Sequence, residues 1–284
     1  MPDDIFENVA KTAISHIVPL RSSGVGSPLF CFPGSGGNIH IFRDMIAAMP
    51  EGPPVYGVNL EWLCDERNEF TVEQIATFYQ PIIQANQKRG PYSFCGYSFG
   101  GLVAYEMARR LTGDGHDVKL VALLDAPNPA LLSNLSAANS AQFRSAYVSN
   151  RIRKYVQFLL SGNIEAFFGR GLAFIVSRAG KWFMPSIKVA FRLLNSPLPA
   201  TFRANDPGFL QAWRIYIPKQ YPNGVVCFRM QDRGPEHDLD PSMGWDACAK
   251  GGVRVLVVPG GHVDMMRMPS VRIISEEIGA CLAI

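Results

Sequence analysis

The sequence has few of the features that mark a metal-binding, nucleic-acid-binding or membrane protein. Its six cysteines are scattered, and they form neither a Cys-x-x-Cys motif nor a Cys/His cluster, which argues against a metal site. The formal net charge of +3 is too small to predict nucleic-acid binding by itself. No uncharged apolar stretch reaches the length of about 18 residues that a membrane span requires. We therefore expect no metal, no nucleic-acid partner and no stable membrane insertion.

Signals for export are also missing from the sequence. Residues 1–18 contain three acidic residues and no long apolar core, so they do not resemble a secretory signal peptide. Cys31, Cys95 and Cys227 fall in apolar, strand-like runs, where a free cysteine packs as a small hydrophobic residue. A reduced, cytoplasmic protein is the simplest interpretation.

The clearest positive signal is the segment Cys95-Gly96-Tyr97-Ser98-Phe99-Gly100-Gly101. It follows an apolar run that begins at Tyr92, and a helical pattern follows it through Leu111. Gly-x-Ser-x-Gly between a strand and a helix is typical of a nucleophile elbow, a strained turn that projects its serine from the sheet edge. The pattern predicts Ser98 as a nucleophile, with the N–H of Phe99 directed at a developing oxyanion. The alternative is a Gly-rich turn with an ordinary serine.

Short apolar runs alternate with helical patterns from Leu29 to Asp125. This order predicts an α/β fold with a mostly parallel central sheet flanked by helices. The predicted strands are 17–20, 29–32, 55–58, 92–95, 118–124, 225–230 and 254–258. Helices are predicted over 39–49, 99–111 and 269–282. A further helix is predicted to begin at Thr71, which forms a capping box with Gln74.

The strand pattern is interrupted between Asp125 and Val225. Helical stretches rich in Phe and Ile lie there, so we predict a helical lid over 130–220, inserted within a single domain of residues 1–284. Residues 131–200 contain nine basic residues and one acid, Glu165. These charges could be solvated helix faces, or they could attract an acidic partner or a membrane surface. Steering of an acidic partner fits a cytoplasmic enzyme better.

A second Gly-rich loop, Gly34-Ser35-Gly36-Gly37, follows the strand 29–32. Such a loop can present backbone N–H groups to an anion, and one interpretation is a phosphate cradle. The segment lacks the Gly-Lys-Ser/Thr ending of a P-loop and the spacing of a dinucleotide-binding motif. A second oxyanion-hole donor, the N–H of Ser35 beside that of Phe99, is the better interpretation, and a plain strand-to-helix turn is the alternative.

A serine nucleophile needs a base and an orienting acid. His262 follows a predicted strand through Pro259-Gly260-Gly261, close to the end of the chain, and fits the chain order Ser, acid, His of α/β-hydrolases. The acid has two candidates: Asp125 ends the strand after the elbow helix, and Asp232 follows the strand after the predicted lid. Either could reach the carboxyl edge of the sheet, although an aspartate that ends a buried strand is the more tightly positioned.

Several motifs together resemble the thioesterase domains that end nonribosomal peptide and polyketide synthases. They are Phe-Pro-Gly-Ser-Gly-Gly (32–37), Gly-Tyr-Ser-Phe-Gly-Gly (96–101), Leu-Leu-Asp (123–125), Gly-Trp (244–245) and Gly-Gly-His-Val-Asp-Met-Met (260–266). The resemblance implies an α/β-hydrolase fold with a lid. It also favours Asp125 as the acid, 27 residues past Ser98, because Asp232 matches the acid position of stand-alone editing thioesterases. That family often has a second proline at the position of Gly34.

The resemblance further implies a substrate and a partner. The acyl chain would arrive as a thioester on the phosphopantetheine arm of an acyl or peptidyl carrier protein, and the domain itself would bind no cofactor. Transfer of the chain to Ser98 would be followed by hydrolysis or cyclisation. A stand-alone editing thioesterase, an acyl-CoA thioesterase or a carboxylesterase would use the same triad. A non-catalytic binding protein with this fold is a further alternative, which the intact Ser98 and His262 disfavour.

Overall fold

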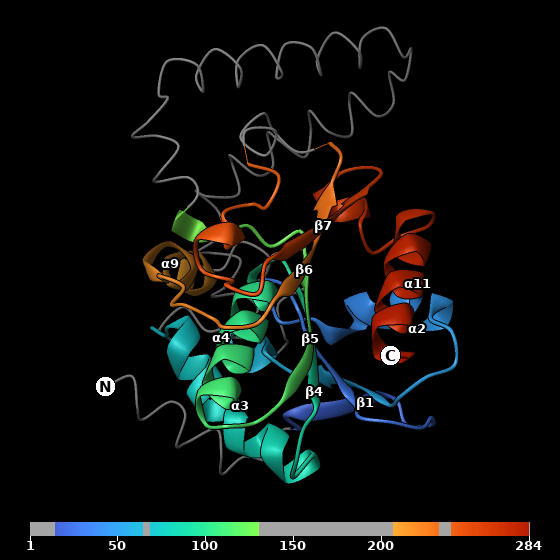
Figure 1. Cartoon of the computed structure of the whole chain (residues 1–284), viewed down its shortest axis with the longest axis horizontal. Helices are drawn as coiled ribbons and strands as arrows, with labels where there is room; N and C mark the ends of the chain where they lie inside the picture. The colour runs from blue at the N-terminus through green and yellow to red at the C-terminus, as the bar shows by residue number, and fades with distance from the viewer. Residues whose placement is uncertain (1–14, 65–68, 131–206, 233–239, 284) are drawn as a thin grey trace, which may run out of the picture.

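The computed structural model describes residues 15–64, 69–130, 207–232 and 240–283 (Figure 1). Seven strands form one sheet in the order β1-β3-β2-β4-β5-β6-β7. All neighbouring strands are parallel except β1 and β3, which are antiparallel. The predicted mostly parallel sheet is confirmed. The strands are β1 (Ile17–Arg21), β2 (Leu29–Phe32), β3 (Val55–Val58), β4 (Tyr92–Tyr97), β5 (Val118–Leu124), β6 (Val225–Met230) and β7 (Val253–Val258).

Helices cover both faces of this sheet. In Figure 1, α3 (Val72–Asn86), α4 (Phe99–Gly113) and α9 (Pro207–Ile215) lie on one side, and α2 (Arg43–Ala48) and α11 (Ser270–Ala283) lie on the other. Strand β4 is buried along its whole length, as expected for a central strand of a covered parallel sheet. Its alternate side chains enter two cores: Phe94 packs on the α3 and α4 side, and Cys95 packs on the α2 and α11 side.

The helices predicted over 99–111 and 269–282 agree with α4 and α11 to within two residues at each end, and one other predicted helix is divided. The predicted helix over 39–49 is divided into a short 3₁₀ segment, η1 (Ile39–Phe42), and α2. The reason is local: the side chain of Asn38 accepts the His40 N–H at 3.0 Å and so opens a tight turn before the α-helix begins. The predicted capping box of α3 is confirmed, because Thr71 and Gln74 bond each other's backbone N–H groups. Pro81 lies inside α3.

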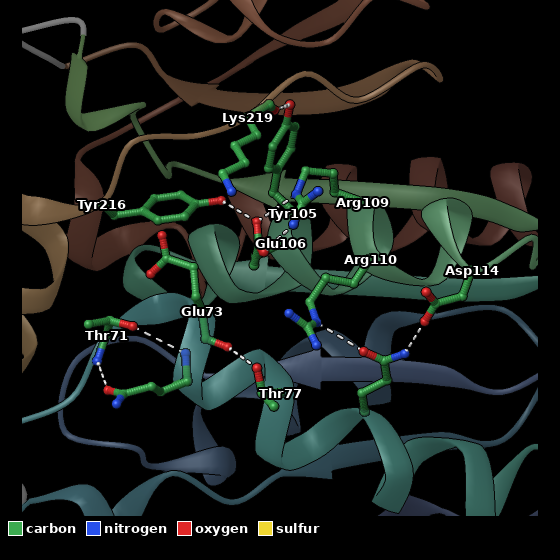
Figure 2. Close-up of polar contacts among 12 residues, drawn as sticks. Thr71, Glu73, Thr77, Tyr105, Glu106, Arg109, Arg110, Asp114, Tyr216 and Lys219 are labelled. Atoms are coloured by element: carbon green, nitrogen blue, oxygen red, sulfur yellow. Dashed lines mark hydrogen bonds and ion pairs between the residues drawn. The ribbon is translucent and has the colours of Figure 1, made fainter. Parts of the chain in front are cut away.

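A buried carboxylate helps to fix α4 against its neighbours (Figure 2). Glu106 on α4 is 1% exposed and accepts two hydrogen bonds from Arg109, at 2.7 and 2.9 Å. The hydroxyl of Tyr216, just after α9, donates to the same carboxylate at 3.2 Å. The hydrogen bond to Glu106 raises the pKa of Arg109, so the guanidinium stays charged, and burial raises the pKa of Tyr216, so its hydroxyl stays a donor. This network ties the segment after α9 to the helix that follows the elbow.

The predicted lid over 130–220 lies largely outside the described residues. Of that range, the structure describes Ala130 and residues 207–220, which include α9. The basic residues counted between 131 and 200 are outside it as well. None of the described helices has the length and apolar character to cross a bilayer.

Candidate active site

The elbow serine has a strained backbone. Ser98 lies between β4 and α4 with φ 53° and ψ −120°, a conformation that non-glycine residues rarely adopt and that costs of order 1–3 kcal/mol. The flanking glycines make the turn possible. A Cβ on Gly96 would overlap the carbonyl of Gly100, and a Cβ on Gly100 would overlap the carbonyl of Phe32. A side chain at either glycine would therefore crowd the backbone. Ser98 itself stays partly exposed in an otherwise buried segment.

Asp125 immediately follows β5, the strand next to β4, and is level with Ser98 across the sheet. Tyr97 is paired with Leu124 in the β4–β5 ladder, and the N–H of Ser98 bonds the carbonyl of Leu124 at 2.9 Å. Ser98 and Asp125 are therefore the first residues beyond two neighbouring strands. Asp125 is fully buried and has φ 48°, a left-handed conformation that aspartate and asparagine tolerate better than most residues. Its Oδ1 accepts the Met230 N–H at 3.3 Å.

His262 is hydrogen-bonded to this buried carboxylate. It follows β7 at the start of η4 (His262–Asp264), and its Nδ1 lies 2.6 Å from Oδ2 of Asp125. An ionised carboxylate can only accept, so Nδ1 carries the proton and Nε2 is left as the basic atom. The imidazole is 36% exposed, whereas the aspartate is 0% exposed. The arrangement is that of a base oriented from behind by an acid.

The alternative acid, Asp232, has a different environment. It lies in an exposed turn after β6. Its backbone N–H donates to the carbonyl of Gly260 at 3.0 Å, so its main chain supports the loop that leads to His262. The carboxylate bonded to the imidazole is that of Asp125. Of the two candidates, the structure brings Asp125, the one that the sequence favoured, to the histidine.

A buried tryptophan helps to fix the loop after Asp125. The indole N–H of Trp245 donates to the carbonyl of Ala126 at 2.7 Å, and Trp245 is fully buried. The side-chain amide of Asn128 donates to the carbonyl of Gly244 at 2.8 Å, and the backbone N–H of Asn128 donates to the carbonyl of Met243. The sequence marked Gly244-Trp245 only as part of a resemblance. Its contact with the aspartate loop joins residues more than 100 positions apart, and no local pattern indicates it.

The two predicted oxyanion donors lie close to the elbow. Phe99 is the first residue of α4, so its N–H belongs to the helix amides that lack an intrahelical acceptor. Ser35 is in a turn closed by a hydrogen bond from Gly37 N–H to the carbonyl of Gly34. Gly34 places this turn beside the nucleophile, because a Cβ on Gly34 would lie 3.4 Å from Cβ of Ser98. Both amides remain predicted donors.

The other histidines have different environments. His116 bonds Gln84 at 3.0 Å and packs edge-on against Tyr92, at the opposite end of β4 from Ser98. His16 lies among aromatic rings that include Trp62. His237 is outside the described residues. In the described ranges, no three His, Cys, Asp or Glu side chains are grouped so as to hold a metal ion.

The fold and the site together define a class. One mostly parallel sheet carries a strained serine on the elbow after β4, an aspartate after β5 and, bonded to it, a histidine after β7. This is the architecture of an α/β-hydrolase. Such a site suits nucleophilic attack on an acyl carbon, with a proton passed to the histidine.

Comparison with known proteins narrows this class. Residues 27–152 match the family model described as Thioesterase domain. The chain is 36% identical to the non-reducing polyketide synthase crz7 of Cladonia metacorallifera over 274 residues, which are 90% of this chain and 12% of that protein. It is 34% identical to a dimodular nonribosomal peptide synthase of Bacillus subtilis (strain 168) over 122 residues, which are 42% of this chain and 5% of that protein. It therefore spans only a small part of the length of these curated relatives.

A solved structure shares the fold. The NocB thioesterase domain, in a covalent complex with a fluorophosphonate nocardicin G analogue, superposes with a TM-score of 0.61 at 18% identity. The match covers 94% of this chain and 99% of that one. This chain is an enzyme of the thioesterase class, and it resembles the thioesterase domains of nonribosomal peptide and polyketide synthases.

Proposed function

We propose that this chain takes an acyl, peptidyl or polyketide chain from the phosphopantetheine arm of a carrier protein and releases it through an acyl-Ser98 intermediate. The observation that carries the proposal is the 2.6 Å bond between His262 and buried Asp125, beside the strained elbow of Ser98. The thioesterase family match over 27–152 supplies the class of bond that is cleaved.

In the first half of the reaction, Ser98 attacks the thioester carbonyl. His262 accepts the serine proton at Nε2, and Asp125 stabilises the imidazolium that forms while it holds Nδ1–H in place. The amides of Phe99 and Ser35 bond the oxyanion of the tetrahedral intermediate, a contact whose removal typically costs about 10²–10³ in rate. His262 then gives its proton to the departing pantetheine sulfur, and the acyl chain remains on Ser98.

In the second half, His262 acts as a base again. It deprotonates either water, which yields a free acid, or a hydroxyl or amine of the acyl chain itself, which yields a ring. The bond between the acyl carbon and Ser98 Oγ breaks when the second tetrahedral intermediate collapses, and His262 returns the proton to the serine oxygen. The same two oxyanion donors serve the second tetrahedral intermediate. No cofactor is needed by the domain in this scheme, because pantetheine is part of the substrate.

The proposal is tested by the mass of the intact protein after brief exposure to an acyl-pantetheine thioester. Wild type should gain the mass of one acyl group, located on the peptide that contains Ser98, and Ser98→Ala should gain none. Ser93→Ala is a matched control, since Ser93 is a fully buried serine on the same strand, β4. It should acylate like wild type.

The competing functions give different results in the same assay. A chain that acylates from simple oxygen esters but never from thioesters is a carboxylesterase, and the proposal is then wrong. Equal kcat/KM for an acyl-CoA and for the same acyl group on a carrier protein would remove the carrier from the proposal. Failure of Ser98 to react with any acyl donor or with a serine-directed fluorophosphonate would leave the binding-protein alternative.

A further inference from the structure

Tyr97 makes two separate contacts with the histidine of the site. Its ring lies parallel to the His262 imidazole, with 5.0 Å between the centroids and 17° between the planes. Its hydroxyl donates to the backbone carbonyl of His262 at 2.9 Å. One side chain thus contacts both the ring and the main chain of the same residue, which is 165 positions away in the sequence.

The position of Tyr97 on β4 gives these contacts a mechanical consequence. Tyr97 is the last residue of β4 and immediately precedes Ser98, so it shares the peptide unit that sets the position of the serine. Tyr97 is 7% exposed and belongs to the same apolar core as Met265 and Met266, which follow the histidine. His262 is therefore held both by Asp125 and by a residue of β4, the strand that leads to Ser98.

The tyrosine ring also borders the loop that carries the second predicted oxyanion donor. A Cβ on Gly34 would lie 3.1 Å from Cδ1 of Tyr97 and 3.4 Å from Cβ of Ser98. The absence of a side chain at position 34 leaves the space that the ring occupies. Tyr97 consequently contacts two loops that converge on the serine, the one that contains Gly34 and Ser35 and the one that contains His262.

The two contacts on His262 constrain different movements of its ring. The bond from Nδ1 to Asp125 fixes one edge of the imidazole but leaves the ring free to rock about that bond. Parallel contact with a buried aromatic ring opposes rocking, and offset stacking is a favourable arrangement for such rings. The hydroxyl bond holds the backbone from which the imidazole extends. Together they define where Nε2 can lie.

We propose that Tyr97 is a positioning residue that holds the imidazole of His262 in the orientation needed to accept the proton of Ser98. The proposal rests on the proposed function only in giving Ser98 and His262 the roles of nucleophile and base. It predicts that changes at Tyr97 slow the chemical step while they leave the binding of substrate unchanged, because the ring acts through the histidine.

The test measures the reaction of Ser98 with a fluorophosphonate, which does not depend on the identity of the acyl substrate. In that reaction the Ser98 Oγ–P bond forms, the P–F bond breaks, the serine proton passes to His262 and fluoride leaves. Tyr97→Phe keeps the ring and loses the hydroxyl bond, and kinact should fall about 3- to 10-fold, as the loss of one neutral hydrogen bond predicts. Tyr97→Leu loses both contacts, and kinact should fall about 100-fold, as expected for a misplaced reacting group. KI should stay within about twofold in both variants if only the chemical step is affected.

Tyr105→Phe is the matched control. Tyr105 is a fully buried tyrosine whose hydroxyl donates to the backbone carbonyl of Lys219 at 2.8 Å, a bond of the same kind in the network of Figure 2. Its removal should leave kinact unchanged. If Tyr97→Leu fails to fold, the comparison of the two Tyr→Phe variants decides the question by itself.

Each outcome has a defined meaning. Tyr97 variants within twofold of wild type, an effect on KI alone, or an equal loss in Tyr105→Phe would each overturn the proposal. Reaction with the fluorophosphonate but not with an acyl-pantetheine would refute the proposed function and still allow Tyr97 to be judged from kinact. No reaction of wild-type Ser98 with the fluorophosphonate would overturn both.

Discussion

Asp125 and Asp232 follow neighbouring parallel strands, β5 and β6, at the same edge of the sheet. Asp125 is fully buried, holds a left-handed backbone conformation and bonds His262 at 2.6 Å. Asp232 lies in an exposed turn and supports the histidine loop through its backbone N–H, which bonds Gly260. Two residues of the same type, one strand apart, thus contribute to the site in different ways, one through its carboxylate and the other through its main chain.

The difference shows why burial matters for an orienting acid. A carboxylate shielded from water interacts more strongly with a developing imidazolium than an exposed one does, because solvent screens the exposed charge. Burial also limits the side-chain rotamers and so fixes the imidazole that the carboxylate bonds. The register of β4 and β5 then places Asp125 level with Ser98. The comparison can be tested at each carboxylate in turn.

The largest effect is expected from Asp125→Asn. Asparagine tolerates the positive φ, and its amide oxygen can still accept the Met230 N–H, so the fold should persist. Its NH₂ group would face Nδ1 of His262 and favour the wrong tautomer, so kcat for thioester hydrolysis should fall about 10⁴-fold. Steady-state kinetics with an acyl-pantetheine would measure this fall, and circular dichroism would check the fold. A decrease of less than tenfold would remove Asp125 from the orienting role.

Glu106→Gln separates the effect of a buried carboxylate in general from that of Asp125. Glu106 is buried, like Asp125, but its carboxylate bonds Arg109 and Tyr216, whereas that of Asp125 bonds His262. Its loss leaves a charged guanidinium with a weaker partner, so the free energy of unfolding should fall by about 1–3 kcal/mol. The rate of Ser98 acylation should stay within about threefold of wild type, because the network does not contact the site. Urea denaturation measures the first quantity and intact mass the second. A large loss of acylation rate in folded protein would show that burial of a carboxylate, not its bond to His262, is what the site requires.

The smallest effect is expected from Asp232→Asn. The substitution keeps the backbone N–H that bonds Gly260 and replaces the exposed carboxylate with a neutral amide of the same size. Both the acylation rate and the free energy of unfolding should stay close to wild type, within about threefold and about 0.5 kcal/mol respectively. Asp232→Pro is the informative companion, since proline lacks the N–H and should loosen the loop before His262. Equal effects of the two substitutions would contradict a main-chain role.

Local sequence patterns predicted much of the fold. Strands β2, β3, β5 and β6 begin and end where the apolar runs do, and Thr71 and Gln74 form the capping box that their spacing indicates. These features depend on residues close together in the chain, where propensity and hydrophobic period act directly. The antiparallel pairing of β1 with β3 was not predicted, because strand direction at a sheet edge depends on the path of the whole chain.

The part of the site that was predicted also depends on residues close together in the chain. Ser98 was indicated by an elbow motif of five consecutive residues, and the overlaps at Gly96 and Gly100 explain why the motif is so compact. The sequence favoured Asp125 and kept Asp232 as an alternative, because contact with the imidazole depends on where the loop of His262 folds back. Tyr97 was part of the elbow motif, but its contact with His262 joins residues 165 positions apart. Residues 131–206, which the sequence predicts to form most of a lid, lie outside the described structure.

The most direct test of the account is a rapid-quench measurement of Ser98 acylation in wild type, Asp125→Asn and Asp232→Asn under identical conditions. We predict one acyl group on Ser98 in wild type and in Asp232→Asn at similar rates, with Asp125→Asn slower by about 10⁴. Slow acylation in Asp232→Asn with Asp125→Asn close to wild type would contradict the account and would transfer the orienting role to the carboxylate after β6.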